Sequence, residues 1–494
     1  MASWSAAVVA AHRGSGRPAV IDGERTVTGA QLLGAAAAAV RWVDALGLPP
    51  GAPLPALVTT NADTFALLLA GAATGHPLAP LGPRLPVPEL VVPLCDLGGH
   101  VLLHEPAFAE TAGETGRVSG ARPVPVPVFA DDGGEPDRLA VPGPESVGVY
   151  LHTGGTTGAP KRVPLTQQVL ARRSAVLSEL VRFDQPDAVF ATGSPVHHIG
   201  GLGNVLVALS AGATVVATPS FGVDWWRGLK ALGVTHALLV PSMIEMLLTA
   251  DALDTVPLRT LVYGASPIHP DTLRRVLEVL PGVRMVNLFG QTEGSPITSL
   301  TPADHLRALD GRPDLLRSVG RPVRGLTLRV EDPDETGAGE LLVRAGHLSL
   351  PGPDGWLRTG DLGTVDDEGY VYLAGRTHDR IVRGGENVYP LEVEQVLRAH
   401  PAIASAGVVG VPDRRLGQTI AAFLVPVGEL PAAGELHAFV RARLAGFKVP
   451  AFWYEVPALP HTGAGKLLRR QLAVWHADPA AADQRIKPII QVDI

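Results

Sequence analysis

Cysteine is almost absent from this sequence, and its scarcity restricts the chemistry open to the chain. Cys95 is the only cysteine among 494 residues, so neither an internal disulfide nor a cysteine-rich zinc cluster can form. Such a chain fits a reducing compartment, and we expect the cytoplasm. The first residues, MASWSAAVVAAHRG, carry no basic leader before their short apolar run. This pattern argues against a secretory signal.

Long apolar runs and excess positive charge are also missing. No stretch approaches the roughly 20 apolar residues of a membrane-spanning helix, so we expect no membrane span. The net charge is -7, which gives no general attraction to nucleic acid. With 46% hydrophobic and 18% charged residues, the chain can bury large cores. Its length predicts about three or four folding units.

Strand-like and helical patterns alternate from the start to about residue 300. Strands are predicted at 53–60, 214–218, 237–240 and 260–263, with helices between them, as at 65–73. This alternation favours a largely parallel sheet covered by helices, and so an α/β fold class. Residues 121–145 are rich in proline and glycine and predict a surface connection. Short strands follow from about 320 to 375 and predict a small antiparallel unit, and a mixed α+β unit comes after it.

A glycine-rich stretch, VGVYLHTGGTTGAPKRVP, occupies residues 147–164. Alternation of Val147, Val149 and Leu151 predicts a strand that leads into it. Glycine lets successive backbone N–H groups approach phosphate oxygens, while threonine hydroxyls and Lys161 add donors and charge. The stretch is not a common P-loop, because the chain leaves it extended and a helix begins only near Thr166. A plain glycine turn between two strands is the alternative.

Four later stretches also combine a glycine turn with a useful polar group. NLFGQTEG (287–294) places Thr292 and Glu293 after a glycine, where a carboxylate suits Mg²⁺. WLRTGDLG (356–363) offers Asp361 in a tight turn, suited to ribose hydroxyls. VYGASPI (262–268) ends a strand in small residues where a flat base fits. LPHTGAGKLLRRQL (459–472) presents Lys466 before a basic helix.

Each of these residues has a simpler interpretation when taken alone. Glu293 can be a helix-start residue, Asp361 a turn aspartate, and Lys466 a solvated lysine at the start of a helix. Together and in this order, however, the stretches resemble the adenylate-forming superfamily. It includes acyl- and aryl-CoA synthetases, the adenylation domains of nonribosomal peptide synthetases, beetle luciferase and CoA-independent amide synthetases. The clearest match, GRTHDRIVRGGENVYPLEVE (375–394), is to the acyl-CoA synthetase branch.

The resemblance implies an N-terminal adenylation domain at 1–375 and a mobile C-terminal domain at 376–494 that carries the catalytic lysine. The first would contain two α/β subdomains and a small β-barrel at about 315–375. The implied reaction has two halves. A carboxylic acid attacks the α-phosphate of Mg·ATP to give an acyl-adenylate and pyrophosphate, and then a second nucleophile displaces AMP. ATP and Mg²⁺ are therefore expected, with CoA as a co-substrate.

The family's functional residues map onto this sequence one by one. Lys466 would bridge the carboxylate and the α-phosphate, Thr292 would contact that phosphate, and Glu293 would hold Mg²⁺. The ATP and AMP site would comprise Thr153, Gly154, Gly155, Thr156, Thr157, Gly158, Lys161, Gly264, Ala265, Ser266, Asn287, Phe289, Gly290, Gln291, Asp361 and Arg376. The acyl pocket would comprise His197, His198, Gly203, Asn204, Gly264 and Gly294, with His198 also gating the thiol tunnel. The hinge would lie at His378, and the tunnel for the thiol or amine would be lined by Gly384, Gly385 and Glu386.

Some positions depart from the family pattern. Gly154 replaces a serine, Arg162 replaces a glycine, and His378 replaces the usual Asp or Lys of the hinge. His197 replaces an aromatic residue; as a metal site the adjacent histidine pair is disfavoured, because neighbouring side chains rarely point at one ion. After Pro450 the sequence reads Ala451–Phe452–Trp453, where many CoA ligases carry a basic residue.

These departures bear on the acceptor. CoA phosphates are captured by Lys and Arg, and Arg383 and Lys448 could still supply charge. The main hypothesis is transfer of an aromatic or heteroaromatic acid to a thiol, with CoA as the expected thiol. The alternatives are a CoA-independent amide synthetase acting on an amine, and a medium-chain fatty acyl-CoA ligase. A descendant without ligase activity is disfavoured because the key polar residues are present. A monomer or homodimer is expected.

Overall fold

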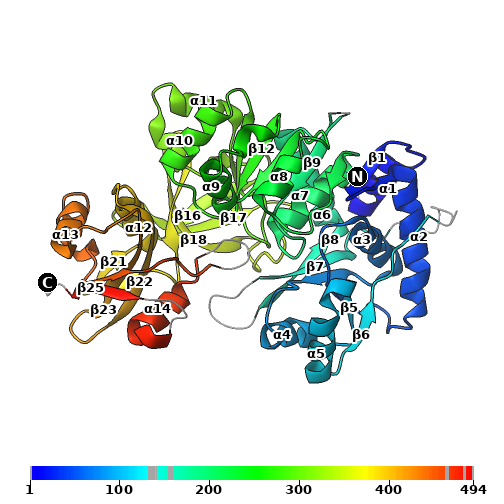
Figure 1. Ribbon diagram of the computed structural model, residues 1–494, viewed down its shortest axis with the longest axis horizontal. Helices are drawn as coiled ribbons and strands as arrows, with labels where there is room; N and C mark the ends of the chain where they lie inside the picture. Colours follow the sequence, from blue (N-terminus) through cyan, green and yellow to red (C-terminus); the bar gives the residue numbers. More distant parts are fainter. Residues whose placement is uncertain are drawn as a thin grey trace.

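The computed structural model describes residues 3–131, 139–140, 142–153, 160–185, 187–461, 467–481 and 486–491. Four sheets organise the chain (Figure 1). The orange-to-red C-terminal segments lie at one side of the molecule, away from the blue and cyan N-terminal segments. The yellow strands, from residues 327–376, lie between them. The chain therefore has a large N-terminal part and a smaller C-terminal part.

The first sheet has nine strands in the order β15-β14-β13-β12-β11-β9-β10-β1-β2. Its strands are β1 (Pro18–Asp22), β2 (Arg25–Thr28), β9 (Val189–Thr192), β10 (Thr214–Val216), β11 (His236–Leu239), β12 (Thr260–Gly264), β13 (Arg284–Phe289), β14 (Thr298–Leu300) and β15 (Arg321–Pro322). The central run from β13 to β1 is parallel. Buried apolar residues fill these strands, as expected for a sheet covered on both faces.

The second sheet has six strands in the order β6-β5-β3-β4-β7-β8. They are β3 (Leu54–Leu57), β4 (Leu78–Leu81), β5 (Val101–His104), β6 (Arg122–Pro125), β7 (Val147–Thr153) and β8 (Lys161–Thr166). Strand β6 lies inside the segment predicted as a surface connection, so that prediction was partly wrong. Pro123 and Pro125 hid the strand, but proline is tolerated in β6 because it is an edge strand.

Fourteen α-helices are present in the described part of the chain. They are α1 (Trp4–His12), α2 (Gly29–Ala45), α3 (Ala62–Thr74), α4 (Val87–Asp96), α5 (Ala109–Ser119), α6 (Gln167–Val181), α7 (Ile199–Ser210), α8 (Val223–Gly228), α9 (Pro241–Thr249), α10 (Pro270–Val279), α11 (Pro302–Leu309), α12 (Pro390–Arg398), α13 (Ala433–Arg441) and α14 (Arg469–Ala477). Local sequence sets their ends. Thr166 caps α6 by accepting from the N–H of Val169, and Asn61 caps α3 in the same way from Thr64. None of these helices is long and apolar enough to cross a membrane.

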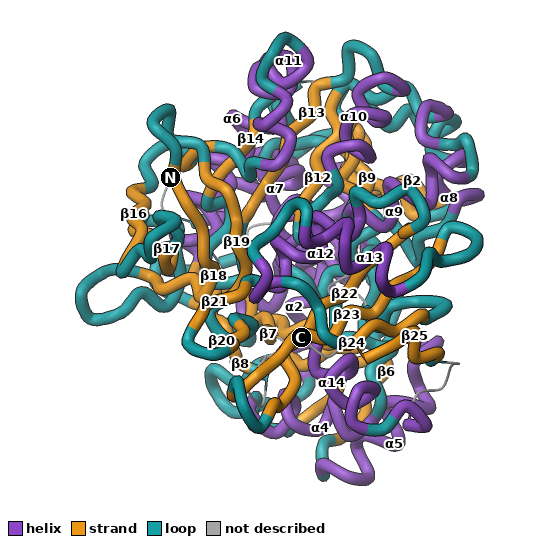
Figure 2. The backbone as a smooth tube through the Cα atoms, turned by 90° about the vertical axis from the view of Figure 1, so that its left-hand side faces the viewer, coloured by secondary structure: helices purple, strands orange, loops and turns teal. Residues whose placement is uncertain are grey.

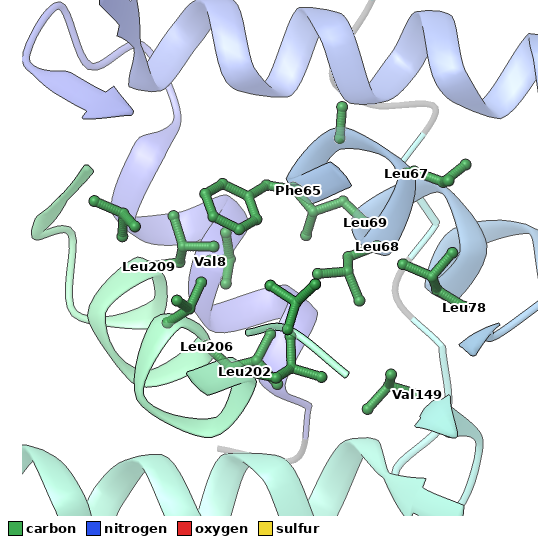
Figure 3. Close-up of a cluster of buried hydrophobic side chains, with 14 of the residues drawn as sticks. Val8, Phe65, Leu67, Leu68, Leu69, Leu78, Val149, Leu202, Leu206 and Leu209 are labelled. Atoms are coloured by element: carbon green, nitrogen blue, oxygen red, sulfur yellow. The ribbon is translucent and has the colours of Figure 1, made fainter. Parts of the chain in front are cut away.

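A shared core joins the first two sheets (Figure 3). Phe65 of α3, Val8 of α1 and Leu206 of α7 meet there, and each is at most 2% exposed. The indole Nε1 of Trp4 also donates to the main-chain carbonyl of Leu206 at 2.9 Å. Fully burying each large apolar side chain contributes about 1.5–3 kcal/mol. This packing holds the two sheets in a fixed relation, on which the site depends.

The third sheet is antiparallel, in the order β16-β17-β18-β19. Its strands are β16 (Thr327–Glu331), β17 (Gly339–Arg344), β18 (Leu357–Val365) and β19 (Val371–Arg376). The small antiparallel unit is thus present, but β16 and β19 are edges, so these strands do not close into the barrel that was expected. Beside this sheet, Tyr389 packs in a small cluster with Leu362 of β18 and donates from its hydroxyl to Asp334 at 2.7 Å.

The fourth sheet and helices α12 to α14 form the C-terminal part, which faces the viewer in Figure 2. Its strands are β20 (Ile381–Arg383), β21 (Glu386–Val388), β22 (Ile403–Asp413), β23 (Gly417–Pro426), β24 (Phe452–Glu455) and β25 (Lys487–Gln491). This part has a core of its own, in which Val408, Leu424 and Trp453 are buried. An independent core is what a separate domain requires.

Candidate active site

The carboxyl ends of β9, β11, β12 and β13 meet at one edge of the first sheet, because these strands are parallel neighbours. Ligands of open α/β sheets bind outside this edge. The loop after β4 of the second sheet comes to the same place. A Cβ on Gly82 in that loop would lie only 3.2 Å from the Nε2 of His197, which follows β9. This contact brings the end of β9 in the first sheet close to the loop after β4 in the second.

The β7–β8 hairpin presents Lys161 at the mouth of the predicted phosphate loop. Thr153 pairs with Lys161 at the ends of the two strands, and both are described. Residues 154–159 lie outside the described residues, so the predictions for Gly154, Gly155, Thr156, Thr157 and Gly158 stay predictions. Lys161 is exposed, as a lysine that reaches for a ligand needs to be.

Arg162 points away from Lys161, because neighbouring residues of a strand face opposite sides. Its Nε lies 3.4 Å from the Oδ2 of Asp96 at the end of α4. Its guanidinium carbon also lies 5.3 Å from the ring centre of Tyr150, in cation–π range. Arg162 therefore lies on the outer face of the hairpin, bound to the end of α4.

The ends of β12 and β13 form the predicted adenine site. Gly264 pairs with Leu288 across the ladder, and a Cβ on Gly264 would lie 2.2 Å from the Leu288 carbonyl oxygen. Only glycine fits there. Ala265 follows with φ +68°, a conformation that costs a non-glycine residue about 1–3 kcal/mol and is typical of functional sites. Asn287 lies buried on β13, and its Nδ2 donates to the Tyr263 carbonyl at 3.4 Å.

A tight turn follows β13 and carries Thr292 and Glu293. It is closed by two main-chain hydrogen bonds between Gln291 and Gly294, of 2.8 and 3.0 Å. Gly290 is required at its start, since a Cβ there would lie 2.7 Å from the Gly294 carbonyl. The interpretation of Glu293 as a helix-start residue is thus wrong, because the residue lies in a turn. Its side chain is half-buried, which leaves it accessible to a ligand.

Arg173 donates hydrogen bonds to this turn, a role that was not predicted from the sequence. It lies on α6, is 3% exposed, and donates to the carbonyls of Thr292 and Glu293 at 3.1 and 3.0 Å. A signal for it existed. Leu170 and Leu177 mark the buried face of α6, and Arg173 lies on the same face at i+3 from one and i−4 from the other.

Asp361 and Arg376 pair across β18 and β19. The Nε of Arg376 lies 2.9 Å from the Oδ1 of Asp361. Asp361 was expected in a tight turn, and this was wrong, because it lies inside β18 and is buried. Gly360 before it has φ +70°, so the glycine bends a strand and does not end it. Strand β18 begins beside the turn of Thr292 and Glu293, since a Cβ on Gly294 would lie 3.0 Å from the side chain of Leu357.

The two adjacent histidines are both uncharged at neutral pH. Their ring centres lie 4.3 Å apart. Burial lowers the pKa of His197 to about 3, with the neighbouring His198 and Arg84 adding to the effect. Burial also lowers the pKa of His198. Neutral imidazoles suit a pocket for an uncharged acyl group. Two other predicted pocket residues, Gly203 and Asn204, lie on α7 and line a cavity with Arg173 and Ser295.

A single carboxylate fits Mg²⁺ in this site. No group of three or more His, Cys, Asp or Glu side chains that could hold a metal occurs in the described ranges. Mg²⁺ does not need one, because it keeps several waters and commonly binds one or two carboxylates together with substrate phosphates. Glu293, half-buried on the turn after β13, is a suitable ligand of this kind.

Comparison with known proteins decides the family. A model of the AMP-binding enzyme family matches residues 7–350, and a model of the AMP-binding enzyme C-terminal domain matches residues 392–466. The chain belongs to the AMP-binding enzyme family. The fatty acid–[acyl-carrier-protein] ligase ScoC of Streptomyces coeruleorubidus is 34% identical over 492 residues, covering 92% of each chain. The 2-succinylbenzoate–CoA ligase of Bacillus cereus strain Q1 is 34% identical over 339 residues, covering 64% of this chain and 68% of that one.

Solved structures of AMP-binding enzymes share the fold. The amide bond synthetase McbA from Marinactinospora thermotolerans superposes with a TM-score of 0.85 at 27% identity, covering 96% of this chain and 99% of that one. The o-succinylbenzoate CoA synthetase of Bacillus subtilis with ATP and magnesium gives 0.80 at 27% identity, covering 95% and 99%. The resemblance to adenylate-forming enzymes and the α/β fold class are thereby confirmed.

The residues predicted for the acceptor side lie in the C-terminal part of this AMP-binding enzyme. Gly384 and Gly385 have φ +60° and +93° and connect β20 to β21. Positive φ at both central residues is the signature of a type I′ hairpin turn, which favours glycine. Glu386 follows, exposed. The imidazole of His378 lies 3.5 Å from the carboxylate of Asp379 in the predicted hinge. Lys466 lies outside the described residues, and its role stays a prediction.

The cations considered for CoA binding are occupied inside the protein. Arg383 is buried and donates to the carbonyls of Phe447 and Val449 at 2.8 and 3.1 Å. Lys448 pairs with both oxygens of Glu392 at 2.8 Å. Trp453, in the stretch where many CoA ligases carry a basic residue, is 1% exposed in the core. It is therefore unavailable as an amine-binding surface.

Proposed function

We propose that this chain activates a carboxylic acid as its adenylate and then transfers the acyl group to a second nucleophile. The observation that supports this best is a continuous series of contacts. The end of β12 pairs with β13, β13 leads into the turn of Thr292 and Glu293, and Gly294 of that turn meets Leu357 at the start of β18. Asp361, on the same strand, pairs with Arg376. The residues predicted for base, phosphate and ribose follow one another along this series, which supports the proposal.

The chemistry follows from charge. In the first half-reaction a carboxylate oxygen attacks the α-phosphorus of ATP, and pyrophosphate leaves with the bonding electron pair. Attack of one anion on another needs neutralising charge, which Lys161 and Lys466 supply electrostatically. Mg²⁺ bound at Glu293 would neutralise the phosphate oxygens. In the second half-reaction the acceptor attacks the acyl carbon and AMP leaves.

For the acid, we favour an aromatic or heteroaromatic ring. The neutral imidazoles of His197 and His198 suit a flat, uncharged group. Several relatives are named for one of two ring-bearing acids, 2-succinylbenzoate or indoleacetate. The ligase ScoC is named for a fatty acid, which keeps a medium-chain fatty acid as the alternative.

For the acceptor, we favour a thiol on a pantetheine arm. The glycine turn of Gly384 and Gly385 suits a narrow tunnel, and the named curated relatives transfer to CoA or to an acyl carrier protein. Since Arg383 and Lys448 are occupied, capture of the CoA phosphates has less support than capture of the pantetheine thiol. The similarity to McbA supports an amine as the second candidate.

For the domains, we propose a division near residue 376 with His378 as the hinge. Rotation at this hinge would bring first Lys466 and then the Gly384–Gly385 turn to the residues predicted to bind ATP. The separate core after residue 380 supports this division. A cytoplasmic location is supported by the unpaired and exposed Cys95.

One mass-spectrometric assay tests the function. The protein is incubated with Mg·ATP and a pool of aromatic and aliphatic acids, with CoA, pantetheine and simple amines offered separately. An acyl-thioester that depends on the thiol supports the main proposal and its mass identifies the acid, whereas amide formation without any thiol supports the second. Lys466→Ala serves as the mechanistic control. Pyrophosphate release at the wild-type rate from that variant would contradict the mechanism.

A further inference from the structure

We infer that Arg173 is a positioning residue that fixes the Thr292–Glu293 turn in the geometry that nucleotide and metal binding require. Arg173 lies on α6, the first helix after the β7–β8 hairpin. It donates from Nη2 to the carbonyls of Thr292 and Glu293 at 3.1 and 3.0 Å, and from Nε to the carbonyl of His347 at 3.0 Å. The inference rests on the proposed function, because it assigns that function a supporting residue.

A packing role alone does not account for an arginine in this place. Burying a cation costs several kcal/mol unless its hydrogen bonds are met, and an apolar side chain of similar volume would fill the space without that cost. Burial lowers the pKa of Arg173 to about 10, with Glu293 acting in the opposite sense. The guanidinium therefore stays charged at neutral pH and holds main-chain carbonyls with charge-assisted hydrogen bonds.

Holding two successive carbonyls fixes the backbone of the turn. Each peptide unit is planar, so fixing the Thr292 and Glu293 carbonyls fixes the peptide planes on both sides of Glu293 and the direction in which its side chain leaves the backbone. The Glu293 carbonyl is held a second time by the N–H of Ser349 at 2.7 Å. Loops that bind phosphate and Mg²⁺ need such pre-organisation, because a misplacement of about 1 Å can cost 100-fold in rate.

The guanidinium of Arg173 also borders a small cavity beside α7, the helix that follows His198. Arg173, Ser174 and Asn204 line a cavity of about 10 Å³ between α6 and α7, the volume needed for one water molecule. The Nη1 of Arg173, the Oγ of Ser174 and the Oδ1 of Asn204 have no hydrogen-bond partner within the described ranges. A water bound there would join Arg173 to α7, which begins directly after His198. Arg173 thus connects α6 to the Thr292–Glu293 turn, and such a water would extend the connection to α7.

Arg172 provides a matched control on the same helix. It is exposed and donates to the carbonyl of Gly346 at 2.8 Å, one residue before the carbonyl that Arg173 holds. Replacing either arginine removes one positive charge from α6. Only replacement of Arg173 removes the guanidinium hydrogen bonds to the Thr292 and Glu293 carbonyls.

The test compares Arg173→Met, Arg173→Lys and Arg172→Met. Binding of Mg·ATP is measured by calorimetry without any acid, at several Mg²⁺ concentrations, and melting temperatures are recorded alongside. We expect Arg173→Met to raise both the Kd for Mg·ATP and the half-saturating Mg²⁺ concentration at least tenfold. Arg173→Lys should recover part of the loss because it keeps the charge, and Arg172→Met should match wild type.

The outcomes separate the possible causes. A lower melting temperature for folded Arg173→Met with wild-type Mg²⁺ dependence would show a merely structural role and overturn the inference. If Arg173→Met does not fold, Arg173→Lys decides, because one ammonium cannot reproduce the guanidinium bonds, and wild-type Mg²⁺ dependence in it would also overturn the inference. A wild-type protein that binds Mg·ATP but activates no acid would refute the proposed function and leave the Arg173 comparison intact.

Discussion

The guanidinium Nε of Arg376 lies 2.9 Å from the carboxylate of Asp361, directly across the ladder of β18 and β19. This pair lies within the third sheet, next to the predicted hinge, since Arg376 ends β19 and His378 follows two residues later. An ATP ribose bound to Asp361 would therefore lie beside the predicted hinge, where the C-terminal part begins. Nucleotide binding and domain movement would then depend on neighbouring residues.

Replacing Asp361 with Asn is expected to weaken ATP binding. The change removes a charged acceptor and leaves Arg376 without its ion-pair partner, and a hydrogen bond to a charged group contributes about 1.5–3 kcal/mol. The KM for ATP should rise at least about tenfold, measured by pyrophosphate release. Glu331→Gln, which removes a carboxylate from β16 that pairs with Arg329, should leave this KM unchanged. Equal effects of both variants would refute a specific role for Asp361.

Lys161 and Arg162 should differ in their effect on adenylation although they are neighbours. Lys161 is exposed at the end of β8, whereas Arg162 is bound to Asp96 on the outer face. We expect Lys161→Ala to slow pyrophosphate release at least 100-fold, or about 2.7 kcal/mol of transition-state stabilisation. Arg162→Ala should change the rate less than threefold. If pyrophosphate release is greatly slowed in Arg162→Ala and not in Lys161→Ala, the roles assigned to the two residues are wrong.

Gly385→Ala should separate the two half-reactions. Gly385 has φ +93°, and a side chain there costs about 1–2 kcal/mol in the turn assigned to the tunnel. ATP–pyrophosphate exchange should stay near wild type, while transfer to the acceptor falls severalfold or more. Gly428→Ala is the matched control, because Gly428 has φ +80° and equally open surroundings elsewhere in the C-terminal part. Equal loss in both variants would indicate general destabilisation of this domain.

His197 should make the fold sensitive to acid. Its pKa is about 3 in the folded protein against an ordinary value near 6.5. Between these values the unfolded chain binds a proton on this ring and the folded protein does not, so stability falls as pH decreases. From pH 6.5 to 4.5 the loss is about 2–3 kcal/mol for this residue.

Denaturant unfolding at pH 7.5 and pH 4.5 measures this loss. His197→Phe should lose about 2–3 kcal/mol less than wild type between the two pH values, because Phe cannot be protonated. His100→Phe, at an exposed position, should show the wild-type difference. If His197→Phe and wild type lose equal stability, the ring of His197 is not held neutral by its surroundings.

The sequence predicted the large elements because their patterns are local. Alternation around Val149 marked β7, and the helical spacing after Thr166 marked α6 with its cap. Asp361 was placed wrongly because Thr359–Gly360–Asp361 contains turn residues, and only the pairing with β17 and β19 shows that the strand continues. Pairing of this kind joins distant residues, so local sequence does not contain it.

The side-chain partners were the part least accessible to prediction. Arg172 and Arg173 have the same side chain, yet Arg172 is exposed whereas Arg173 is buried and bonds the turn of Thr292 and Glu293. Arg383 and Lys448 were counted as free charges for CoA, but their partners come from other segments of the C-terminal part. Motifs indicate which residue types are present, whereas burial decides which of them remain available to a ligand.

The docking of α1 also has a consequence during synthesis of the chain. Trp4 is 1% exposed in the finished protein, and its indole donates to the carbonyl of Leu206 on α7. The ribosome must therefore produce about 200 further residues before this partner exists, which takes roughly 10–40 s at 5–20 residues per second. Helix α1 also contacts α2 and α6, but until α7 exists its apolar face is only partly covered, so the nascent chain offers a site for chaperones.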